Sequence, residues 1–180
     1  NSMTAKPSEA AVASMLPFLT QMWGVPTQPH QMGQELFFSM KESYQAIYAL
    51  LQAKESDRFI LTSSGSEAVN HVFLSAYLDI TDPTGKNQYI TSAIDEAASL
   101  MSLSRLEQLG CISKMIKPNS EGVVSAKSIA DAITPRTALV SLSYANGLTG
   151  VINPIDEIAA LCQSRGIALH IDVTHVLGRI

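Results

Sequence analysis

The chain has 180 residues, of which 46% are hydrophobic and 16% are charged, and its formal net charge at pH 7 is −4. This length and balance are typical of one globular domain with an apolar core. It contains no basic run of the kind that nucleic-acid binding requires, no signal sequence, and no apolar run near the ~20 residues of a membrane-spanning helix. We therefore expect a cytoplasmic protein without a nucleic-acid or membrane partner.

The first third of the chain is predicted to form helices and no strand. Residues 9–22 and residues 33–54 carry apolar side chains at helical spacing. A proline-containing irregular connection separates them at residues 23–30. We assign residues 1–57 to an N-terminal helical segment.

From residue 58 onward, short apolar strands alternate with helices. The predicted strands are 58–62, 88–93, 111–116, 137–144 and 167–173. The predicted helices are 64–79, 95–109, 125–133 and 154–166, with a turn at 82–85. Several of these strands are apolar throughout, which indicates burial on both faces. The pattern therefore predicts an α/β fold with a mostly parallel sheet covered by helices on both faces.

The turn from the strand at 58–62 into the next helix contains Ser64, Gly65, Ser66 and Glu67. Small residues at a helix start leave several backbone N–H groups unpaired and pointing one way, which makes a phosphate-binding site. A second interpretation is that Ser64 or Ser66 caps the helix and that Glu67 is the acidic residue favoured in a first turn. The turn alone is consistent with both interpretations, the phosphate-binding site and the helix cap.

Two other predicted strands end in polar residues that an apolar sheet does not need for stability. Residues 141–150 open from a strand into a glycine-containing loop, and Asp172 ends the last strand with His175 shortly after it. Ligands of open α/β sheets bind beyond the carboxyl ends of the strands. An anion site, a carboxylate and amide or imidazole groups at one edge suit a phosphorylated heterocyclic cofactor.

The two cysteines, Cys111 and Cys162, have no His, Asp or second Cys at the spacing of metal ligands. We expect both to be reduced thiols in the core, and we expect no metal site.

At these segments the sequence resembles the class V aminotransferases, which are fold-type-I pyridoxal-phosphate enzymes, and among them the NifS-like cysteine desulfurases. Residues 59–70 are similar to the family's FTSGATEANN segment, residues 140–151 to its VSxxxxNNExG segment, and residues 170–178 to its HVDAxQxxGK segment. Trp23, Gly24, Pro26 and His30 fall where the family has GNPSSxH. The resemblance implies that residues 58–180 are part of a large domain that binds pyridoxal 5'-phosphate, here incomplete.

The resemblance also implies a role for each matching position. Gly65 and Ser66 would hold the cofactor phosphate, and Asp172 would pair with the pyridine nitrogen so that the ring acts as an electron sink. His175 would hydrogen-bond the ring hydroxyl, and Asn146 would face that hydroxyl or the substrate carboxylate. From the residues alone, Asp172 also suits a cap for the next turn, and His175 suits a packed polar side chain.

The sequence departs from the family pattern at several positions. Glu96 stands where the desulfurases place the histidine that stacks on the ring and moves protons, so Glu96 joins Asp172 as a candidate catalytic residue. Val25 replaces the Asn of GNPSSxH, and Gly147 and Leu148 replace the second Asn and the Glu of NNE.

The resemblance implies a fragment of an enzyme that converts L-cysteine to L-alanine and transfers the sulfur. It places the Schiff-base lysine beyond Ile180, so we expect these residues alone to be inactive. The implied partners are a small amino-acid substrate, a second copy or the rest of the same enzyme, and a sulfur-acceptor protein. Two alternatives stay open: another class V reaction (transaminase, lyase or selenocysteine-type), or a non-catalytic homologue that serves as a binding partner.

Overall fold

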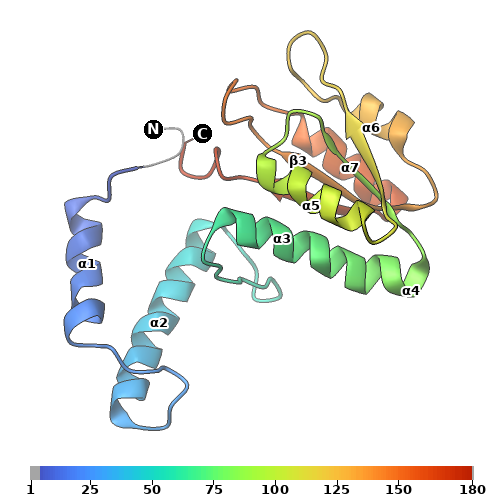
Figure 1. The fold of residues 1–180 in the computed structure, drawn as a ribbon. Coiled ribbons are helices and arrows are strands. Elements are labelled where there is room, and N and C mark those ends of the chain that lie inside the picture. The colour runs from blue at the N-terminus through green and yellow to red at the C-terminus, as the bar shows by residue number, and fades with distance from the viewer. Residues whose placement is uncertain (1–4, 180) are drawn as a thin grey trace. The chain divides into compact units, whose positions relative to one another are not determined.

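The computed structural model describes residues 5–179, and the chain forms two compact units that divide after Leu61 (Figure 1). The first unit contains the two predicted helices, α1 (Glu9–Thr20) and α2 (Gln31–Leu50). The Ser8 hydroxyl caps α1 by accepting a bond from the Ala11 amide at 3.1 Å. His30 caps α2 in the same way, because its Nδ1 accepts from the Gly33 amide at 3.2 Å. None of the described helices is long and apolar enough to cross a membrane.

The predicted strand at 58–62 is wrong, because these residues form no regular structure. The segment after α2 folds back on that helix, where the Tyr48 hydroxyl donates to the Asp57 carbonyl at 2.8 Å and the Tyr44 and Phe59 rings meet edge to face. Ile60 and Leu61 stay 62% and 63% exposed. No strand among residues 5–179 pairs with this segment, and an isolated strand leaves its backbone groups without partners.

The second unit is built on a four-stranded parallel sheet with the order β2-β1-β3-β4. Its strands are β1 (Gln88–Ser92), β2 (Ile112–Ile116), β3 (Thr137–Ser143) and β4 (Ala168–Asp172). Its helices include α3 (Gly65–Ala76), α5 (Ala97–Glu107), α6 (Ala126–Ala132) and α7 (Ile155–Arg165). The two central strands are buried along their whole length, including the polar residues Gln88, Thr91 and Ser92 of β1.

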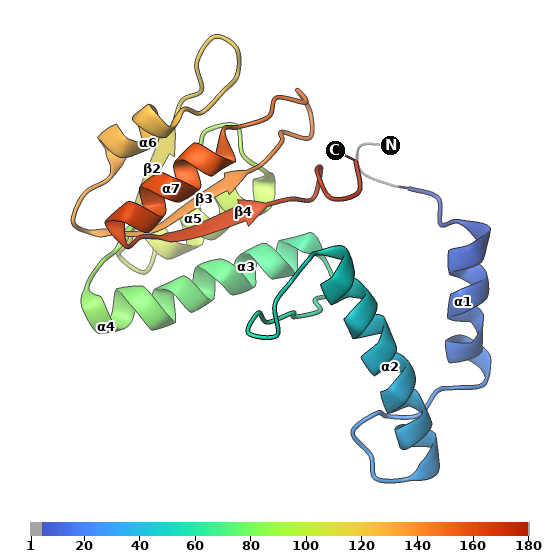
Figure 2. The same cartoon turned by 180° about the vertical axis from the view of Figure 1, so that it is seen from behind.

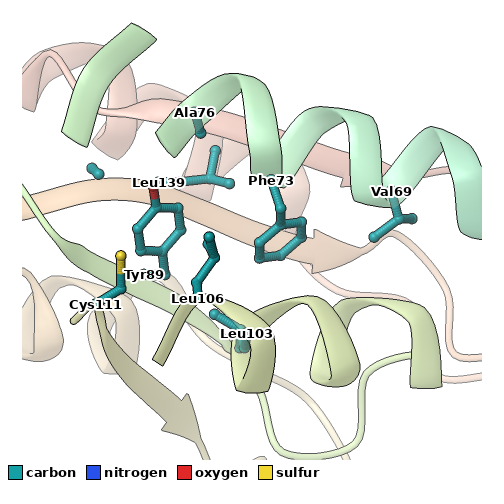
Figure 3. Packing of buried hydrophobic residues seen from close by; sticks show 9 residues of the cluster. Val69, Phe73, Ala76, Tyr89, Leu103, Leu106, Cys111 and Leu139 are labelled. Carbon is teal, nitrogen blue, oxygen red and sulfur yellow. The ribbon is translucent and has the colours of Figure 1, made fainter. Parts of the chain in front are cut away.

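Each face of the sheet is covered by a pair of helices (Figures 1 and 2). Helices α3 and α5 pack on one face, where Phe73 stacks on Tyr89 and where Leu103 and Leu106 fill the space beside them (Figure 3). Helices α6 and α7 pack on the other face, around Ile90, Val140, Ile129 and Ile158. The α/β fold with a parallel sheet between two helical layers is therefore confirmed.

Helix α3 does not end at a turn near residue 82, as predicted, but continues through a π-helical turn, η1 (Tyr77–Thr81), into α4 (Asp82–Thr84). The π turn places the Thr81 hydroxyl 2.7 Å from the hydroxyl of Tyr89 in the core. Pro83 is tolerated because it lies in the first turn of α4, where its missing N–H is not needed. Gly85, at φ 73°, then ends the helix in the left-handed region.

Candidate functional site

The carboxyl ends of β1, β3 and β4 lie at one edge of the sheet because the strands are parallel. The first turn of α3 and the end of β4 line a shared open pocket at this edge. Gly65, Ala68 and Val69 form one wall, and residues 170–174 with Leu177 form the other. Two of the predicted site residues, Gly65 and Asp172, therefore face the same space.

The start of α3 has free amide donors. The Ser64 hydroxyl accepts from the Glu67 amide at 3.2 Å, so Ser64 is the cap, as one of the two sequence interpretations stated. The amides of Gly65 and Ser66 have no hydrogen-bond partner within the described part of the chain. A Cβ on Gly65 would meet no atom within 4 Å, so the backbone there is open to a ligand.

Glu67 lies beside these donors but is turned away from them. Its carboxylate accepts from the Ser63 amide at 2.6 Å and from the Ser63 hydroxyl, and the Ser63 hydroxyl bond is the main reason why the pKa of Glu67 is lowered. The carboxylate thus fixes the residues before the helix and leaves the first amides of α3 uncovered.

Asp172 ends β4 with one carboxylate oxygen in use. Its Oδ1 accepts from the Thr174 amide at 2.8 Å, which is the turn-capping role open to it from its sequence position. Its backbone carbonyl accepts from the Tyr144 amide at 2.9 Å, which ties the end of β4 to the end of β3. The side chain is therefore held in place at the pocket, and its second oxygen, Oδ2, has no hydrogen-bond partner among residues 5–179.

Glu96 and His175, both predicted as site residues, lie next to each other. Nε2 of His175 is 3.3 Å from Oε1 of Glu96, and their side chains are 13% and 37% exposed respectively. Glu96 comes from the loop after β1 and His175 from the turn after β4. The sequence placed them in one site through separate roles and did not predict this contact.

Asn146 uses its side chain within the protein. Its Nδ2 donates to the Ile94 carbonyl at 2.7 Å, and its Oδ1 accepts from the amides of Leu148 and Thr149. These bonds shape the loop after β3 and join it to the loop after β1. In this conformation the carboxamide is occupied by these loops.

Asp95 is a residue of this edge whose role the sequence did not reveal. It is buried, and its carboxylate accepts from the Ser143 amide at 3.0 Å, from the Ser143 hydroxyl, and from the Thr91 hydroxyl at 2.9 Å. It thereby clamps the end of β1 to the end of β3. The available signal was an acidic residue shortly after a predicted strand, whereas Asp172 was identified as a carboxylate that ends a predicted strand.

A pair of residues that the sequence did not reveal, Ser141 and His170, lies two residues before the ends of β3 and β4. Nδ1 of His170 is 2.8 Å from the Ser141 hydroxyl, and the imidazole meets the Phe73 ring edge to face. Burial lowers the pKa of His170, and the nearby carboxylates of Asp172 and Asp95 oppose that shift. A mostly neutral imidazole therefore stands behind Asp172 in the wall of the pocket.

Comparison with known proteins agrees with this architecture. A cysteine desulfurase of Gluconacetobacter diazotrophicus is 31% identical over 181 residues, and one of Klebsiella pneumoniae is 31% identical over 180 residues. Each match covers 100% of this chain and 44% of the relative, so the chain spans less than half the length of these curated relatives.

Solved structures show the same fold. A NifS-like protein superposes with a TM-score of 0.89 at 24% identity, over 95% of this chain and 47% of that one. DndA from Streptomyces lividans superposes with a TM-score of 0.82 at 27% identity, over 96% of this chain and 48% of that one. The family model described as aminotransferase class-V matches residues 1–180. With this fold and with strand ends that carry the family's motifs, the chain belongs to the class-V aminotransferases.

Proposed function

We propose that the carboxyl edge of the sheet binds pyridoxal 5'-phosphate and that the full protein is a cysteine desulfurase, which removes sulfur from L-cysteine and leaves L-alanine. The observation that carries this proposal is the shared pocket between the first turn of α3 and Asp172. The similarity to cysteine desulfurases of Gluconacetobacter diazotrophicus and Klebsiella pneumoniae supports the choice of reaction.

The residues of the pocket fit this cofactor. The free amides of Gly65 and Ser66, at the positive end of α3, suit a phosphate, and the open space at Gly65 lets the phosphate approach the backbone. Asp172 supplies a carboxylate for a protonated pyridine nitrogen. Its Thr174 contact fixes the rotamer and uses only Oδ1.

The bound cofactor would supply an electron sink for negative charge that develops on the substrate. The chain's own residues would bind and orient the cofactor and the substrate. Asp172 would hold a proton between its carboxylate and the ring nitrogen, and the α3 amides would anchor the phosphate end. His175, brought to the edge by the turn after β4, would donate to or accept from an oxygen of the ring or the substrate.

Residues 58–180 would be part of the large cofactor-binding domain, and residues 1–57 an N-terminal segment of the same enzyme. A second copy of the protein and a sulfur-acceptor protein would be its partners, as the family resemblance implies.

One observation favours a second candidate, a different class V reaction on a small amino acid. In the desulfurase pattern the proton-transfer group is a histidine at the position of residue 96. Here that position is Glu96, and the imidazole of the site belongs to His175. The cofactor site is the same in both candidates, so only the substrate and product separate them.

The test uses the full-length protein purified with pyridoxal 5'-phosphate. We expect a visible absorbance band that borohydride abolishes while it links the cofactor covalently to the protein, loss of that band in Asp172→Ala, and sulfide release from L-cysteine. A matched control is Asp131→Ala on helix α6, which should keep the band.

The outcomes separate the candidates. A band with sulfide and alanine from L-cysteine supports the desulfurase. A band without sulfide, but with turnover of another amino acid, supports the second class V reaction. Absence of cofactor binding in the wild-type protein would contradict both.

A further inference from the structure

Three loops meet where two of the departures from the family pattern, Glu96 and Gly147, lie. Glu96 follows β1, Gly147 follows β3 and His175 follows β4, so the three residues are far apart in the sequence. Glu96 is 3.3 Å from Nε2 of His175, and Gly147 lies against the same imidazole. Changes that look unrelated along the chain therefore meet at one side chain.

Glu96 directly precedes α5, and its side chain does not cap the helix. Its backbone carbonyl accepts from the Ser99 amide at 3.0 Å, whereas its carboxylate makes no capping bond. The side chains that ordinarily cap a helix from this position are those of Ser, Thr, Asp and Asn, and glutamate is not among them. The carboxylate faces His175 instead, so the local helix does not account for it.

Gly147 is fitted to the imidazole. A Cβ at this position would lie 2.3 Å from Nε2 and within 2.8 Å of the neighbouring ring carbons of His175. Real side chains do not approach this closely, so any other residue would displace the ring or the loop. Asn146 and Asp95 hold the flanking loops through their hydrogen bonds, which leaves little freedom for such a shift.

We propose that Glu96 is a positioning residue that holds the imidazole of His175 in one tautomer and orientation for proton transfer with the amino-acid substrate, and that Gly147 provides the space for it. This inference rests on the proposed function. It deepens that function by assigning the proton-transfer group and its support.

The chemistry follows from the contact. A proton on Nε2 faces a carboxylate oxygen, whereas a lone pair on Nε2 would face another lone pair, so the neutral ring carries its proton on Nε2. The lone pair is then on Nδ1. In the proposed step Nδ1 accepts one proton from the bound amino acid, and the ring returns that proton to the product side, so protons balance over a turnover.

The first test reads the tautomer without any turnover. In the full-length, cofactor-free protein with ¹⁵N-labelled histidine, the His175 signals, assigned by their loss in His175→Gln, should show protonation at Nε2 alone. Glu96→Ala should give averaged signals of both tautomers, and Glu96→Gln, which keeps an acceptor oxygen, should restore the Nε2 form. Glu121→Ala, in an exposed turn, is the matched control and should leave the spectrum unchanged.

The second test is a double-mutant cycle on kcat/KM. We expect His175→Ala to lower kcat/KM about 100-fold or more, as for loss of a general acid or base. Glu96→Ala should lower it about tenfold, mainly through kcat, and should have no further effect in the His175→Ala background, since Glu96 acts through His175. His71→Ala on the exposed face of α3 is the control for loss of an imidazole.

A cycle with Gly147 tests the packing. Gly147→Ala should lower kcat/KM in the wild-type background. In the His175→Ala background it should leave kcat/KM nearly unchanged, because the ring with which the new Cβ clashes is absent. An unchanged tautomer in Glu96→Ala, or an equal loss from Glu96→Ala in both backgrounds, would overturn the inference while cofactor binding persists. Failure of the proposed function is distinguishable, because the wild-type protein would then not bind the cofactor.

Discussion

The imidazole of His170 occupies the wall of the pocket between β4 and α3, with Ser141 on one side and Phe73 on the other. Its neighbours Leu169 and Ile171 point to the opposite face of the sheet, into the core under α6 and α7. Burial favours the neutral ring, which lowers the pKa of His170 below its ordinary value of 6.5. At the residue scale, this is a titratable group whose charge is tied to the folded state.

We therefore expect the stability of the protein to fall on mild acidification, in part through His170. As the pH drops below about 6.5, the unfolded chain binds a proton at this residue before the folded chain does, so the free energy of unfolding decreases. In His170→Asn the decrease between pH 7.5 and pH 5.5 should be smaller than in the wild type. Urea unfolding midpoints at the two pH values measure this difference.

The control for this prediction is His71→Asn, because His71 is exposed on α3. That variant should follow the wild-type pH dependence. An equal loss of stability in wild type and His170→Asn would show that the buried imidazole does not carry the effect.

Local sequence patterns identify some residues of the site and not others. Gly65 and Asp172 were identifiable because a turn motif and a strand end are local patterns, and the structure places both on one pocket. The pairing of Ser141 with His170 was not identifiable, because it depends on the register in which β3 and β4 lie side by side. Contacts between loops, such as that of Glu96 with His175, depend on the same long-range geometry.

At the scale of elements, the site edge depends on how the strand ends are joined. Asp95 connects β1 to β3 through bonds from Thr91 and Ser143, and it lies directly before Glu96. The buried carboxylate thus sets the position of the α5 start. Parallel strands alone do not fix their loops, so such a clamp determines where the site side chains stand.

We expect Asp95→Ala to lower the free energy of unfolding by about 3 kcal/mol, because it leaves the buried Ser143 amide and Thr91 hydroxyl without their acceptor. Asp95→Asn keeps an acceptor oxygen and the same shape, so its loss should be clearly smaller. Denaturant unfolding of the full-length protein compares the two. Equal stability of Asp95→Ala and the wild type would contradict the clamp.

The strands and helices of the second unit were largely predictable, because apolar runs and helical spacing are strong local signals. The segment at 58–62 was mispredicted for a physical reason: Phe59, Ile60 and Leu61 have strand composition, but the described chain provides no neighbouring strand, and Phe59 packs on Tyr44 instead. Strand propensity reflects a fit to a pleated neighbour rather than a preference of the isolated backbone. The π turn after α3 was missed because it has no periodic signature.

At the scale of the whole molecule, the first compact unit ends in an irregular segment. Residues 51–61 contain no helix or strand, and both Lys54 and Arg58 are exposed there. Exposed irregular backbone is the preferred site of proteolytic cleavage. The division of the chain after Leu61 thus has a direct biochemical consequence.

Limited trypsin digestion of the full-length protein should therefore cut first after Lys54 or Arg58. Lys114 is a matched control, because it is exposed but lies within β2, where β1 holds its backbone in the sheet. Mass spectrometry of the early fragments identifies the sites, and Lys54→Gln/Arg58→Gln should slow the first cut. Early cleavage after Lys114 would contradict the expected order.

The π turn at Tyr77–Thr81 makes the number of residues in this part of the chain as important as their kind. A π turn closes its hydrogen bonds over one more residue than an α turn. Deletion of a single residue there would leave Val69 and Phe73 on the sheet but rotate everything after the turn by about 100°. Thr81 would then leave the hydroxyl of Tyr89, so natural variants of this helix should tolerate substitutions at exposed positions such as Leu78 far better than a change of length.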